Sequence, residues 1–189
     1  MTGERAVTFR PSPTPAMRVA LVFLAATLAG CASTAERAPS PMPDSRAVAL
    51  TRDALVVDTH IDVPYRLMER FEDVSEATAT GDFDHPRAVA GGLDVAFMSI
   101  YIPADYQDTG GARAYADSLI DLVEGIADGA PDKFAVVRSA ADVARLRQPG
   151  RVLLALGMEN GAPVEGDLSS LAHFRDRGIL YVTLTHSRD

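Results

Sequence analysis

Four short apolar segments, separated by stretches with helical periodicity, constrain the fold of this chain more than any other feature. The segments cover residues 55–58, 93–101, 152–158 and 179–185. Each is a mainly apolar run of the length that a buried strand requires. Because strands that alternate with helices pair in parallel, the sequence predicts an α/β fold.

The stretches between these segments predict helices and loops. Helices are expected at 65–71, 112–128 and 139–146, and from Asp167 or Ser169 to residue 178. In 112–128 the apolar residues share one helical face, namely Ala116, Leu119, Ile120, Val123 and Ala127. Ser139 and Asp142 form an acidic variant of the helix-capping pattern. Residues 72–90 predict a loop, and residues 134–137 predict a short extended segment.

Polar side chains, several of which are potential metal ligands, lie at or just beyond the ends of the predicted strands. Asp58 ends the first segment and is followed by His60 and Asp62, Tyr101 ends the second, and Glu159 and His186 follow the third and fourth. In a strand, residues two apart face the same side, so Asp58, His60 and Asp62 are expected to converge. Parallel strands place their carboxyl ends at one edge, where barrel enzymes gather their catalytic groups. Imidazole and carboxylate ligands suit a divalent metal such as zinc, which indicates a metallohydrolase.

Simpler interpretations exist for each of these residues. They are a hydrogen-bonded core histidine for His60, a cap of the turn before Pro64 for Asp62, a solvated strand end for Glu159 and a surface position for His186. Tyr101 is either barrel packing or part of a pocket lining. His85 is expected to be structural or exposed, and His173 to be solvated.

Three groups of residues together resemble the membrane dipeptidase family, the renal-dipeptidase-like zinc peptidases. They are VDTHIDVP at 57–64, GGLDVAFMSIY at 91–101, and GMENG at 157–161 followed by GILYVTLTH at 178–186. They occur in the family's order and span nearly all of residues 55–189. The His-x-Asp motif also differs from the His-x-His of the broader amidohydrolase class. The resemblance implies a (β/α)8 barrel with two zinc ions.

The same resemblance implies roles for individual residues. His60 and Asp62 would ligate one zinc ion, Glu159 would bridge both ions and act in catalysis, and Asp58 would support the site. His186 would contact the substrate and steady its tetrahedral intermediate. The substrate would be a dipeptide, cleaved by a water molecule that the paired ions activate.

Other parts of the family's site are not found in this sequence. In the family, the second zinc ion is bound by two further histidines from later strands. A later arginine and a later aspartate take part in substrate binding and proton transfer. A closed barrel of this type has about 250 residues, and this chain has 189. We therefore expect residues 48–189 to be the N-terminal half of the barrel, inactive by itself. The alternatives are a non-catalytic lipoprotein that keeps a half-barrel as a binding or structural module, and another metal-dependent hydrolase that acts on a cyclic amide or lactone.

The N-terminal region predicts export and a lipid anchor. Arg18 precedes an apolar run at residues 19–29, which is shorter than the about 20 residues that span a bilayer and fits a signal peptide. Leu-Ala-Gly-Cys at 28–31 resembles a bacterial lipoprotein signal, so Cys31, the single cysteine, is expected to be lipidated. The predicted regions are an extension and signal peptide at 1–30, with Met1 or Met17 as the start, and a lipidated linker at 31–47. This predicts a membrane-anchored lipoprotein on the periplasmic or outer-membrane face.

Composition limits the partners of the chain. With 26 acidic and 18 basic residues its formal charge is −8, which argues against nucleic acid and against a polybasic membrane surface. The hydrophobic share of 47% is that of a globular protein. A homodimer is possible for the full-length protein.

Overall fold

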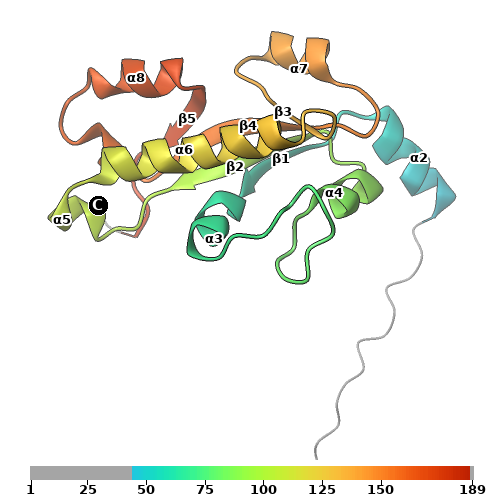
Figure 1. Ribbon diagram of the computed structural model, residues 1–189. Helices are drawn as coiled ribbons and strands as arrows, with labels where there is room; N and C mark the ends of the chain where they lie inside the picture. Colours follow the sequence, from blue (N-terminus) through green and yellow to red (C-terminus); the bar gives the residue numbers. More distant parts are fainter. Residues whose placement is uncertain (1–43, 188–189) are drawn as a thin grey trace, which may run out of the picture. The chain divides into compact units, whose positions relative to one another are not determined.

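The computed structural model describes residues 44–187, so the predicted signal peptide, Cys31 and most of the linker lie outside the described residues. The elements are α2 (Ser45–Asp53), β1 (Val57–Ile61), α3 (Val63–Glu69), α4 (His85–Gly91), β2 (Val95–Tyr101), α5 (Tyr106–Thr109), α6 (Ala112–Gly129), β3 (Phe134–Val136), α7 (Ala140–Leu146), β4 (Val152–Glu159), the 3₁₀ turn η1 (Ala162–Val164), α8 (Ser170–Asp176) and β5 (Ile179–Thr183) (Figure 1). Within this part of the chain, no helix has the length and apolar character needed to cross a membrane.

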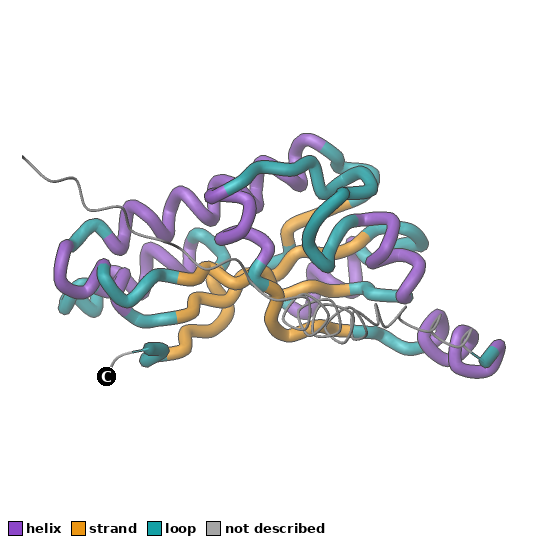
Figure 2. The backbone as a smooth tube through the Cα atoms, turned by 90° about the horizontal axis from the view of Figure 1, so that it is seen from below, coloured by secondary structure: helices purple, strands orange, loops and turns teal. Residues whose placement is uncertain are grey.

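The five strands form one parallel sheet, which confirms the predicted α/β fold (Figure 2). The strand order is β1-β2-β4-β3, and β5 also pairs with β4. β2 pairs along one edge of β4, and β3 and β5 share the other edge. β3 pairs with Val152–Leu154 of β4, and β5 pairs with the carboxyl half of the same strand, from Leu156 to Glu159.

The main core lies between the sheet and α6, which packs along β2, β3 and β4 (Figure 1). The face of α6 predicted from its periodicity is buried, as expected from its 3.6-residue repeat: Ala116, Leu119, Ile120, Val123 and Ala127. From the sheet, alternate residues such as Met98, Ile100, Leu154 and Leu156 enter the same core. The opposite face of the sheet, which carries Phe97, Ser99 and Glu159, is not covered by α6.

The sheet is strongly curved, and a single contact shows this. The Tyr181 hydroxyl on β5 donates a hydrogen bond to the Thr59 carbonyl on β1 at 3.1 Å. In a flat sheet these strands would be three spacings apart, about 14 Å, which is well beyond the reach of a tyrosine side chain. The two outer strands therefore approach each other over a concave face, and Tyr181 lies on that face.

Several predicted boundaries differ from the structure. β1 covers Val57–Ile61 rather than 55–58, α3 covers Val63–Glu69 rather than 65–71, and β5 ends at Thr183 rather than at 185. The loop predicted at 72–90 contains α4, because the Asp84 carboxylate accepts the backbone N–H of Arg87 and caps a helix whose first turn holds a proline. Gly92, at φ 78°, ends that helix in the left-handed conformation. At the N-terminal side, α2 begins at Ser45, ahead of the boundary expected at Val48. By contrast, the predicted cap of α7 is confirmed, since Ser139 accepts the backbone N–H of Asp142 at 3.1 Å.

Candidate metal centre

A bulge in β1 decides which side chains reach the site. Asp58 pairs with Ala96 and Ile61 pairs with Met98, so three steps along β1 match two steps along β2. The extra residue interrupts the two-residue alternation and places His60 on the concave face, opposite to Asp58. The prediction that Asp58 converges with His60 is therefore wrong. The Asp58 carboxylate instead accepts the backbone N–H of His60 at 3.0 Å, a local turn contact that supports the bulge.

Asp62 occupies the N-cap position of α3, but its side chain makes no capping hydrogen bond. Its Oδ1 lies 3.3 Å from Nε2 of His60, and 63% of the side chain is exposed. The interpretation of Asp62 as a turn cap does not fit this geometry. The carboxylate is left free to act as a ligand beside the His60 ring.

Glu159 is the last residue of β4 and pairs with Tyr101 on β2 and Thr183 on β5. Its Oε2 lies 3.1 Å from Nε2 of His60, and its Oε1 lies 3.0 Å from Nε2 of His186. The side chain is only 13% exposed, so it is not a solvated strand end. Each of its two carboxylate oxygens therefore faces a different imidazole.

The structure brings three of the predicted site residues into one group. One ligand atom each of His60, Asp62 and Glu159 lies within 4.8 Å of the other two. An imidazole nitrogen with two carboxylate oxygens is a ligand set that zinc accepts, and three protein ligands leave a position for water or substrate. These residues therefore fit a divalent metal ion at the carboxyl edge of the sheet.

His186 lies just beyond β5, beside this group. Its ring meets the Tyr101 ring edge-on with centroids 5.0 Å apart, and Tyr101 meets Tyr65 in the same way at 5.1 Å. His186 is therefore not a buried packing residue or an isolated surface residue. It contacts both the Tyr101 ring and the Glu159 carboxylate.

Two residues of the site were not predicted from the sequence. Ser99 is fully buried, and its hydroxyl donates to Oε2 of Glu159 at 2.9 Å. The alternation of β2 could have identified it, because Ser99 shares a face with Tyr101. Tyr181 reaches the site only because of a register shift in β5. Burial raises the pKa of its phenol, and the carboxylates of Glu159 and Asp62 raise that pKa further, so the hydroxyl stays a donor at neutral pH.

The two other histidines of the chain are bound elsewhere. Nε2 of His85 lies 2.7 Å from the Gly150 carbonyl. His173 was predicted to be solvated, but its Nε2 lies 2.9 Å from Oδ1 of Asp117, because α8 packs its polar face against α6. Neither imidazole reaches the candidate metal centre.

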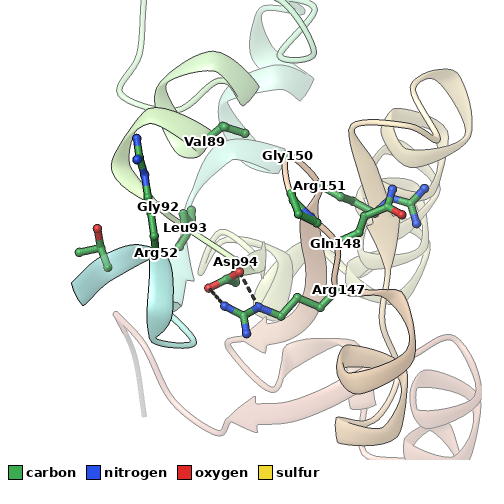
Figure 3. Close-up of a pocket in the computed structure, with 11 residues that line it drawn as sticks. Arg52, Val89, Gly92, Leu93, Asp94, Arg147, Gln148, Gly150 and Arg151 are labelled. Atoms are coloured by element: carbon green, nitrogen blue, oxygen red, sulfur yellow. Dashed lines mark hydrogen bonds and ion pairs between the residues drawn. The ribbon is translucent and has the colours of Figure 1, made fainter. Parts of the chain in front are cut away.

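A cleft of ≈ 610 Å³ lies at the amino ends of β1, β2 and β4, the edge opposite to the metal centre. Its carboxylate, Asp94, is held by Arg147 through two hydrogen bonds of 2.8 and 3.2 Å (Figure 3). Arg147 also donates to the Ala54 carbonyl at 2.8 Å, just ahead of β1. Arg147 thus links Asp94, just before β2, to Ala54, just before β1. Because the Asp94 carboxylate is bound by Arg147, it is not free to bind a metal.

An imidazole–carboxylate group at the carboxyl edge of a parallel α/β sheet is the arrangement of a metal-dependent hydrolase. The family described as membrane dipeptidase, peptidase family M19, matches residues 44–189. The chain therefore belongs to the membrane dipeptidase family. Membership of this metallopeptidase family implies a metal ion, and the group formed by His60, Asp62 and Glu159 is where the described residues offer ligands for one.

Individual relatives agree with this membership. Dipeptidase 3 of Rattus norvegicus is 31% identical over 150 residues, which cover 77% of this chain and 30% of the relative. Dipeptidase ataJ of Aspergillus terreus is 26% identical over 146 residues, covering 71% of this chain and 36% of the relative. The crystal structure of the dipeptidase AC, a family M19 metallopeptidase, superposes with a TM-score of 0.63 at 25% identity, covering 71% and 43% of the two chains. The chain thus spans about a third of the length of these curated relatives.

Proposed function

We propose that this chain is part of a zinc-dependent dipeptidase. The observation that carries the proposal is the group of ligand atoms from His60, Asp62 and Glu159, all within 4.8 Å of one another. They come from the segments whose sequences resemble those of the family, in the family's order. The substrate class, a dipeptide, follows from the family rather than from the geometry of the site.

The geometry suggests a role for each residue. His60 and Asp62 would hold one ion, and Glu159 would bridge a pair of ions, since its two oxygens face different sides of the site. Zinc at this position supplies a Lewis acid that lowers the pKa of a water molecule and polarises a carbonyl. His186 would orient the substrate, because its imidazole is presented between Tyr101 and Glu159.

We further propose that hydrolysis needs residues beyond those of this chain. A second ion requires further ligands, and the remaining imidazoles, His85 and His173, are engaged away from the site. The curvature of the sheet supports its interpretation as part of a (β/α)8 barrel, which must bend until its outer strands meet. The 189 residues alone would then bind one metal ion without turning over a dipeptide.

The location of the enzyme is also a proposal. Leu-Ala-Gly-Cys at 28–31 supports an exported lipoprotein that is anchored through Cys31 and acts at the periplasmic or outer-membrane face. Incorporation of labelled palmitate, measured in cells, would test this. Cys31→Ala is expected to abolish the label, and labelling that persists in this variant would contradict the anchor.

Hydrolysis assays on the product of the complete gene test the proposed activity. With zinc added, we expect cleavage of dipeptides but not of lactones or cyclic amides. His60→Ala and Glu159→Gln should each lower kcat/KM by more than about 100-fold, because even indirect supports of a metal ligand cost about 10–100-fold. His173→Ala, which removes an imidazole outside the site, is the matched control. Preference for a lactone, or full activity of the His60 variant, would contradict the proposal.

A further inference from the structure

Tyr181 connects the two outer strands of the concave face at the position of a candidate ligand. Its hydroxyl donates to the Thr59 carbonyl at 3.1 Å, and Thr59 directly precedes His60. The same oxygen lies 3.5 Å from Nδ1 of His60. The ring packs against Phe97 of β2 with centroids 5.5 Å apart, so the phenol crosses the sheet rather than pointing into solvent.

Both nitrogens of the His60 ring are thereby assigned to different neighbours. Nε2 faces Asp62 at 3.3 Å and Glu159 at 3.1 Å, whereas Nδ1 faces the Tyr181 hydroxyl. A phenol oxygen can accept one hydrogen bond while it donates another. Histidines that bind metals usually donate their second N–H to an oxygen, which fixes the tautomer and the orientation of the ring.

We propose that Tyr181 is the positioning residue of the metal centre: it accepts the Nδ1 proton of His60, donates its own proton to the Thr59 carbonyl, and so presents Nε2 to the metal. This inference rests on the proposed metal centre.

Two backbone features make room for this arrangement. A Cβ atom at Gly157 would lie 2.2 Å from Cζ of Tyr181, so only glycine lets the ring cross β4. A register shift also aligns Ile179 with Leu156 but Tyr181 with Gly157. Ile179 therefore enters the core on one face, while Tyr181 lies on the other. Gly157 leaves space for the Tyr181 ring, and the register shift at the start of β5 turns that ring toward β1.

The test compares zinc affinity of the full chain and three variants, by competition with a chromogenic chelator. Tyr181→Phe removes only the hydroxyl and keeps the ring. Tyr115→Phe, which removes a hydroxyl from a tyrosine on α6 that stacks on Tyr106, is the matched control. Gly157→Ala keeps the hydroxyl but displaces the ring. We expect zinc binding to weaken about 10–100-fold in the Tyr181 and Gly157 variants and to stay unchanged in the Tyr115 variant.

Long-range proton–nitrogen NMR spectra of the zinc-loaded chain separate positioning from general loosening. With Tyr181 present, His60 should be a single tautomer with its proton on Nδ1, and in Tyr181→Phe this signal should shift or broaden. Weakened binding with an unchanged His60 signal would overturn the role of Tyr181. So would equal zinc affinity in the unaltered chain and in Tyr181→Phe. If the unaltered chain shows no zinc binding that His60→Ala abolishes, the metal centre itself is wrong, and this role is overturned with it.

Discussion

Ser99 provides a test of how the protein holds Glu159. Its hydroxyl is fully buried and donates to Oε2 of Glu159 at 2.9 Å, while the carboxylate itself is 13% exposed. Ser99→Ala removes this donor, and little water can reach the carboxylate to replace it. A hydrogen bond to a charged acceptor contributes about 1.5–3 kcal/mol. At about 1.4 kcal/mol for each factor of ten, we expect zinc affinity to fall about 10–100-fold.

The assay is competition for zinc against a chelator of known affinity, with circular dichroism to show that the variant is folded. Ser118→Ala is the matched control, because the Ser118 hydroxyl is exposed and donates to the Ala114 carbonyl within α6 at 3.0 Å. It should bind zinc like the unaltered chain. If folded Ser99→Ala binds zinc as tightly as this control, Ser99 does not orient Glu159 and the reasoning fails.

Three further outcomes are expected. Hydrogen bonds from Arg87 hold the pKa of buried Asp84 well below its usual range, so the stability that this carboxylate contributes is complete above about pH 4 and is lost as the pH falls further. In urea unfolding at a series of pH values, the free energy of unfolding of Asp84→Asn should therefore fall less steeply in acid than that of the unaltered chain, and an equal fall would contradict this. His186→Ala should lower kcat/KM of the complete gene product about 100-fold while zinc affinity, measured by competition, changes little; an equal loss of both would make His186 a ligand instead. Arg147→Ala should lower the free energy of unfolding by about 1 kcal/mol, since the guanidinium that binds Asp94 is partly exposed; no change in urea unfolding would show that this ion pair is not stabilising.

Local patterns predicted the regular parts of the fold. The apolar face of α6 follows a 3.6-residue period, and the cap formed by Ser139 needs only residues close in sequence. These features depend on few long-range contacts, so the sequence alone identified them. The carboxyl edge was also predictable, because parallel strands place Glu159 and His60 at the same end of the sheet.

Features set by strand pairing could not be read from the sequence. The bulge in β1 is defined only against β2, and without it Asp58 would share a face with His60. The contact of Tyr181 with Thr59 joins positions 122 residues apart and requires the curvature of the whole sheet. His173 likewise finds Asp117 only because two helices pack together. Register and helix packing, rather than local preference, decide these positions.

Anomalous diffraction at the zinc edge, from crystals of the zinc-loaded chain, tests the central claim most directly. The account places a zinc peak about 2.0–2.2 Å from Nε2 of His60 and from carboxylate oxygens of Asp62 and Glu159. A zinc peak bound elsewhere, with these three side chains unliganded, would contradict it.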